Sequence, residues 1–145
     1  AIVGDTPALV EDKVDSSLGS DIVTNGGFDT DSGWTKGTGW TISGGTASSD
    51  GTQGDYSNIV QASILTVGSV YKVQFNITEI SAGHFRPSIQ TSANVLGDSY
   101  TTIGEKTWYV RASGTDLMLQ ASADFVGSID DVSIKPFNGN YGALL

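Results

Sequence analysis

The chain contains 145 residues, 38% of them hydrophobic, which is enough for one domain with a single buried core. Its 16 acidic and seven basic side chains give a net charge of −9, which opposes phosphate backbones and excludes nucleic acid as an expected partner. The absence of cysteine excludes disulfides and thiolate nucleophiles, and we expect no membrane insertion because no apolar run approaches about 20 residues.

Residues 1–20 differ in pattern from the rest of the chain and are predicted to form an N-terminal arm. Thr6 followed by Pro7 is typical of a helix start. The apolar residues that then recur at a spacing of four are Val10, Val14 and Leu18. About 12 residues form only a marginal helix alone, so we expect a short helix or an extended arm whose apolar stripe docks on another protein chain.

Residues 21–136 show the two-residue hydrophobic period of β-strands. The clearest run covers residues 71–77, and further strands are expected at 59–65, 108–111, 117–121 and 129–134. The 19 glycines are spread along the chain and mark turns between these runs. Short strands, frequent turns and no helical pattern after residue 20 predict an all-β fold, with the strands in an antiparallel sandwich or barrel.

Two further features follow from the same pattern. The three-residue step between Ile129 and Val132 predicts a bulge in the last strand. Residues 137–145 are expected to form a C-terminal tail outside the sheet. The large aromatic residues assigned to the core are Trp34, Tyr71 and Phe75.

The sequence does not favour an enzyme. His84 is the single histidine, and no nucleophile-elbow pattern accompanies it, so we interpret it as a loop or strand-start residue. Most acidic residues occupy turns, as in Asp50-Gly51, where aspartate is favoured by backbone geometry alone. The glycine-rich residues 37–39 lack the lysine of a phosphate-binding loop, and residues 29–40 lack the spacing of an EF-hand.

A binding module agrees better with the composition. Flat aromatic side chains and planar polar side chains are the groups that hold sugar rings and their hydroxyls. The residues that we assign as candidate ligand contacts are Trp40, Phe85, Arg86 and Gln90.

Three segments resemble carbohydrate-binding modules of the family 4/9 type. They are residues 23–29 (VTNGGFD) with the following 39–45 (GWTISGG), residues 65–75 (LTVGSVYKVQF), and residues 129–134 (IDDVSI). The similarity covers roughly residues 21–135. It implies a galactose-binding-like jelly roll, that is, a β-sandwich of two antiparallel sheets with a ligand cleft on its concave face. The sequence of residues 25–40 is most similar to versions of this module on bacteriophage structural proteins.

The same resemblance implies one structural calcium ion where the first and last strands meet. The positions that match the family's acidic ligands are Asp29, Asp130 and Asp131. Carboxylates from opposite ends of a domain would hold its termini together through a hard cation. The family usually has glutamate at the first of these positions, where this chain has the shorter Asp29.

Three functions follow as hypotheses. The leading one is a non-enzymatic bacteriophage virion protein, most simply a capsid decoration protein on the particle surface, whose arm of residues 1–20 contacts capsid or tail subunits. The second is a glycan-binding adhesion module of a phage tail fibre or tail-tip protein, with cell-surface glycans as partners. The third is a carbohydrate-binding module of a bacterial glycoside hydrolase. Self-association into a homo-oligomer is left open.

Overall fold

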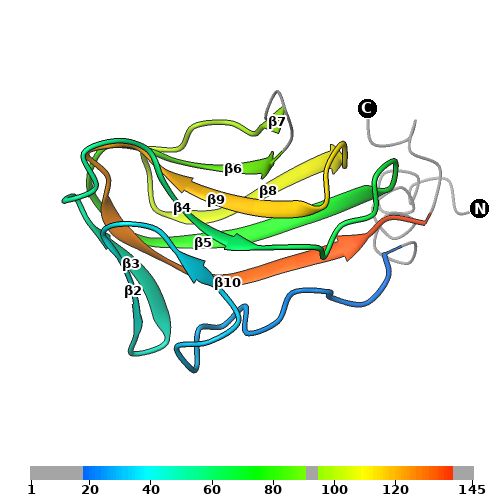
Figure 1. Ribbon diagram of the computed structural model, residues 1–145, viewed down its shortest axis with the longest axis horizontal. Coiled ribbons are helices and arrows are strands. Elements are labelled where there is room, and N and C mark those ends of the chain that lie inside the picture. The colour runs from blue at the N-terminus through cyan, green and yellow to red at the C-terminus, as the bar shows by residue number, and fades with distance from the viewer. Residues whose placement is uncertain (1–17, 91–94, 139–145) are drawn as a thin grey trace, which may run out of the picture.

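A computed structural model describes residues 18–90 and 95–138 of the chain. Within these residues the chain forms ten β-strands and no helix, and the strands build two sheets that face each other (Figure 1). The predicted all-β sandwich is therefore confirmed. Most of the predicted N-terminal arm, expected as a short helix or an extended segment, and most of the predicted tail lie outside the described residues. No described segment forms a helix long and apolar enough to cross a membrane.

The first sheet has five antiparallel strands in the order β1-β4-β9-β6-β7. Its central strand, β9, pairs along its whole length with β6 and along residues 117–121 with β4. The strands of this sheet are β1 (Thr35–Lys36), β4 (Ser57–Gln61), β9 (Asp116–Ala121), β6 (Phe85–Gln90) and β7 (Val95–Leu96).

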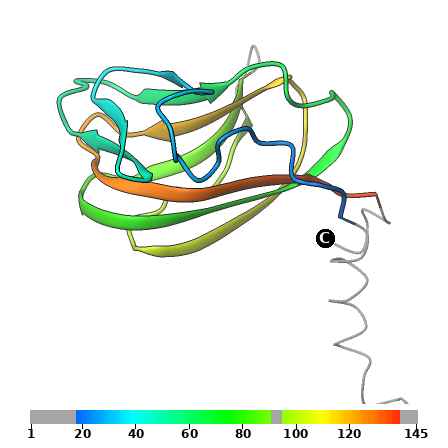
Figure 2. The same cartoon turned by 90° about the horizontal axis from the view of Figure 1, so that it is seen from below.

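The second sheet also has five antiparallel strands, in the order β2-β3-β10-β5-β8. The two longest strands, β5 and β10, lie side by side at its centre, as both views show (Figures 1 and 2). The strands of this sheet are β2 (Trp40–Ser43), β3 (Thr46–Asp50), β10 (Val126–Pro136), β5 (Val70–Ala82) and β8 (Gly104–Arg111).

The two sheets bury a core of aliphatic and aromatic residues between them. Along β5, Tyr71, Val73, Phe75 and Ile77 are all buried, which confirms the predicted alternation. Trp34 is buried as well, and its ring lies 5.4 Å from that of Phe28. The predicted assignment of Trp34, Tyr71 and Phe75 to the core is therefore confirmed.

The start and end of the sandwich are held together along β10. The N–H of Gly19 donates to the carbonyl of Pro136 at 2.8 Å, and the N–H of Ile22 donates to the carbonyl of Ile134 at 2.9 Å. The register of β10 against β5 shifts between Asp130 and Ser133, which confirms the predicted bulge. Asp131 at this bulge has a φ of +52°, a left-handed conformation that local packing must support.

Candidate functional site

A row of polar side chains crosses the outer face of the first sheet. On β9, Leu117, Leu119 and Ala121 point into the core, so Gln120 points outward. Gln120 pairs in register with Asn58 on β4 and with Arg86 on β6. The three side chains therefore form one row across the middle of this sheet, which we call the polar row.

Tyr56 lies across the polar row. It precedes β4, yet its hydroxyl lies 3.0 Å from Nε2 of His84, which precedes β6. The guanidinium carbon of Arg86 lies 4.4 Å from the centre of the Tyr56 ring. Because β9 separates β4 from β6, the Tyr56 side chain crosses above β9. Gln120 is only 7% exposed on this outward face, where Arg86 donates a hydrogen bond to it, while Tyr56 is 42% exposed.

The sheet fixes both partners of Tyr56. The N–H of His84 donates to Oγ of Ser122 at 2.9 Å, and its carbonyl accepts the N–H of Ser122 at 2.9 Å. Nε of Arg86 donates to Oε1 of Gln120 at 2.6 Å. His84 is thus a residue at the start of a strand, as predicted. Because Ser122 fixes His84 and Gln120 fixes Arg86, these two residues in turn fix the position of the Tyr56 ring.

An open groove of about 350 Å³ lies beside Tyr56, on the outer side of β1 and β4. Its lining combines polar and apolar surface and comes from residues 35–38, Gln53, residues 56–58 and Val60. Asn58 lines this groove, and its Oδ1 is buried without a hydrogen-bond partner in the described residues. Lys36 also lines the groove, but its Nζ is paired with Oδ1 of Asp31 at 2.6 Å.

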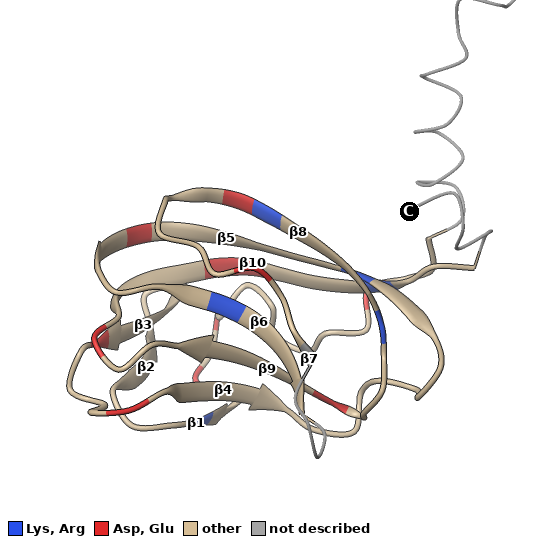
Figure 3. Ribbon diagram, turned by 90° about the horizontal axis from the view of Figure 1, so that it is seen from above, with Lys and Arg blue, Asp and Glu red and all other residues tan. Residues whose placement is uncertain are grey.

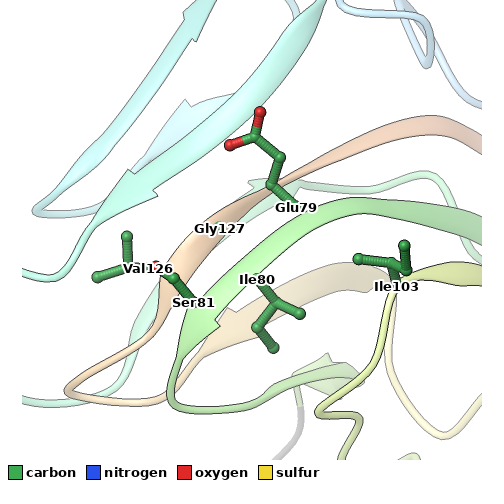
Figure 4. A pocket seen from close by; sticks show the side chains of 6 residues that line it. All are labelled: Glu79, Ile80, Ser81, Ile103, Val126 and Gly127. Atoms are coloured by element: carbon green, nitrogen blue, oxygen red, sulfur yellow. The ribbon is translucent and has the colours of Figure 1, made fainter.

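A second hollow of about 340 Å³ lies on the other sheet, where β5 and β10 run beside the turn before β8 (Figure 4). Its side chains include the apolar Ile80, Ile103 and Val126 and the carboxylate of Glu79. It contains no aromatic ring and no amide side chain. The groove beside Tyr56 is therefore the site with the groups that a polar, ring-shaped ligand requires.

The structure divides the four predicted ligand contacts into two groups, with two residues in the core and two on the outer face of the first sheet. Phe85 is 0% exposed and Trp40 is 6% exposed, so the structure places both rings in the core and not on an outer face. The Phe85 ring lies within 5.3 to 6.0 Å of those of Phe75, Phe125 and Trp40, which makes it the centre of an aromatic cluster in the core. The cause is strand alternation, because Phe85 and Arg86 are neighbours on β6 and only one of them can face outward.

The other two predicted contacts lie on the outer face. Arg86 is in the polar row, and Gln90 is exposed at the end of β6, opposite Asp116 of β9. Sequence reasoning missed Tyr56, Asn58 and Gln120. The alternation along residues 57–61 and 117–121 indicates that Asn58 and Gln120 face outward. No local sequence feature around Tyr56 indicates that its side chain reaches the residue before β6.

The three acidic residues expected to bind calcium lie near one another. Burial raises the pKa of Asp130 above its ordinary value, and the negative charges of Asp131 and Asp29 act in the same direction. One oxygen of Asp130 accepts the N–H of Asp131 at 2.7 Å. Within residues 18–90 and 95–138, no three acidic or histidine side chains are placed to hold a metal ion together. A bound ion would therefore need backbone and water oxygens as further ligands, and the calcium site stays a prediction.

The chain has the jelly-roll fold of carbohydrate-binding modules. It matches the CBM22-1 xylan-binding domain of Xyn10C from Paenibacillus barcinonensis with a TM-score of 0.56 and 14% identity, over 84% of this chain and 98% of that one. A structure described as CBM4 matches with a TM-score of 0.51 and 12% identity, over 79% of this chain and 99% of that one.

Part of a viral protein has a similar fold. The enzymatically active domain of tailspike protein 4 from bacteriophage CBA120 matches with a TM-score of 0.52 and 15% identity, over 81% of this chain and 21% of that one. No protein-family model matches the sequence, and no curated protein matches it. These identities are low, so the similarity establishes the fold and does not assign a function to the site.

Proposed function

We propose that this protein is a non-catalytic glycan-binding module whose ligand lies along the outer face of the first sheet. The observation that supports this proposal most strongly is the position of Tyr56, an exposed aromatic ring beside a groove lined in part by polar groups. The ring of a sugar has an apolar C–H face and a rim of hydroxyls, so it fits a flat aromatic surface with amide and hydroxyl groups around it.

Asn58 supplies a polar contact for such a ligand. Among the described residues, its Nδ2 donates to the sulfur of Met118 at 3.6 Å, and its Oδ1 has no hydrogen-bond partner. A buried acceptor without a donor costs about 1–3 kcal/mol. A small rotation of this amide would present the oxygen to the groove that Asn58 lines, where a sugar hydroxyl would satisfy it.

A glycan array followed by calorimetric titration tests this proposal. We expect the chain to bind a subset of saccharides, and we expect Tyr56→Ala to weaken that binding at least about tenfold by removing the stacking surface. Tyr109→Ala is the matched control, because Tyr109 lies on the outer face of the second sheet, opposite Lys72. Absence of binding to every saccharide, or equal losses in the two variants, would contradict the proposal.

A second candidate function is that of a virion surface protein, with the sandwich displayed on a bacteriophage capsid or tail. Two observations favour it, namely the resemblance of residues 25–40 to phage structural proteins and the fold shared with a phage tailspike domain. Residues 1–31 carry seven acidic residues and one basic residue, Lys13, a charge that suits docking on a basic surface of neighbouring virion proteins. This role is compatible with glycan binding.

Deletion of residues 1–17 tests the virion role. The deletion leaves Leu18, which pairs with Phe137, and Gly19, which pairs with Pro136. We expect particles produced with the shortened chain to lack it, whereas the full chain is incorporated. Equal incorporation of both chains would show that the arm is not the anchor.

A further inference from the structure

Arg86 has binding capacity that the fold does not use. Its Nε donates to Gln120, and its guanidinium lies against the Tyr56 ring, but Nη1 and Nη2 make no hydrogen bond to the described residues. The side chain is half-buried. A guanidinium can donate two parallel hydrogen bonds to one carboxylate, and two of the groups needed for this remain available here.

The missing ion pair is unexpected in a chain with this composition. Acidic residues outnumber basic ones by 16 to seven, yet Arg86 forms no salt bridge within residues 18–90 and 95–138. Figure 3 shows the basic segment of β6 beside β9, whose greater part is uncharged, and β4 beyond β9 carries no charged residue. A partly desolvated cation without an anion is unfavourable, and a bound anion would offset that cost.

We propose that the glycan bound on this face carries a carboxylate, which means that it contains an acidic sugar such as a uronic acid or a sialic acid. This inference rests on the proposed glycan-binding function and specifies its ligand. Arg86 receives the carboxylate through Nη1 and Nη2. Gln120 and Tyr56 hold the guanidinium from the side and from the face, so little conformational freedom is lost when the anion binds.

The net charge of the whole chain further restricts the class of acidic glycan that can bind. A net charge of −9 repels polyanions at long range. The other basic side chain of the site, Lys36, is already paired with Asp31. One available cation in a negative field suits isolated carboxylates in an otherwise neutral glycan, and it does not suit a densely sulfated polymer.

The test compares saccharides that differ only in the charge of one carboxylate. The probes are 3′-sialyllactose and a glucuronic acid disaccharide, each as the free acid and as its methyl ester, titrated calorimetrically into the full chain. We expect at least one free acid to bind about tenfold or more tightly than its ester, the effect of one charge-assisted hydrogen bond. In Arg86→Gln the acid and the ester should bind equally, and Arg86→Lys should keep part of the difference.

Lys135→Gln is the matched control, because it removes the same unit of charge from the second sheet and should leave the preference unchanged. Equal binding of acid and ester by the unmodified chain would overturn the acidic-sugar proposal while leaving glycan binding in place. Equal loss of the preference in Lys135→Gln and Arg86→Gln would also overturn it, since net charge rather than Arg86 would then be responsible. Failure of both acids and both esters to bind, together with an array without neutral ligands, would overturn the proposed function as well.

Discussion

The hydroxyl of Tyr56 lies 3.0 Å from Nε2 of His84, and this hydrogen bond connects the residues that directly precede β4 and β6, the strands on either side of β9. It orients the one aromatic ring of the candidate site. The ring and the hydroxyl have different roles, because the ring offers a stacking surface and the hydroxyl only fixes its direction.

Tyr56→Phe separates these roles. We expect this variant to keep saccharide affinity within a few-fold, because the ring remains, and to lose no more than about 1 kcal/mol of unfolding free energy, the usual contribution of one hydrogen bond. Calorimetry and urea denaturation measure the two effects. A loss of affinity as large as that of Tyr56→Ala would mean that the hydroxyl, and not the ring, makes the important contact.

Phe85→Ala is expected to destabilise the fold strongly. The ring is fully buried among Phe75, Phe125 and Trp40, and a cavity of this type costs about 3–5 kcal/mol. Urea denaturation measures this loss, and Phe85→Leu should lose less because most of the volume is kept. Unchanged stability combined with lost glycan binding would instead identify Phe85 as a ligand contact.

Gly26→Ala is expected to cost at least about 2 kcal/mol, because an added Cβ would collide with the backbone carbonyl of Val132. The same approach allows the N–H of Val132 to donate to the carbonyl of Gly26 at 3.0 Å. Gly27→Ala is the matched control, since its Cβ would meet only the Asp29 side chain at 3.8 Å. Thermal unfolding compares the two variants, and equal melting temperatures would contradict this explanation.

Calcium is expected to stabilise the fold if it binds where the resemblance places it. Burial and the negative charges of Asp131 and Asp29 disfavour the charged form of Asp130, and a cation that binds there only in the folded state would raise the melting temperature. Calorimetric scans with calcium and with EDTA measure the difference, and Asp29→Asn should reduce it. Identical scans under the two conditions would exclude a structural calcium ion.

Much of the fold could be predicted from the sequence because strand periodicity is a local property. The alternation along β5 and the step between Ile129 and Val132 both appear in the structure as expected. The two-residue period along 117–121 predicts a strand, but it does not predict that Met118 and Gln120 on the outward face are only 4% and 7% exposed. Their burial depends on neighbours that are distant in sequence, which a local pattern does not contain.

The site was harder to predict for the same reason. Sequence alone could not decide which of the neighbours Phe85 and Arg86 faces the core, and both were assigned to the ligand. It also gave no sign that Tyr56 approaches His84, which is 28 residues away in the chain. The rings of Trp40 and Phe85, which the sequence analysis assigns as ligand contacts, pack in the core between the two sheets.

The most direct test of the account is to map the bound saccharide on the chain by NMR. Amide spectra of the isotope-labelled protein would be recorded while the best-bound saccharide of the array is added. We predict that the largest shifts occur at Tyr56, Asn58, Gln120 and Arg86, and that the outer residues of β5 and β8 stay unchanged. Shifts centred on the second sheet, or on the hollow beside Glu79, would contradict the account.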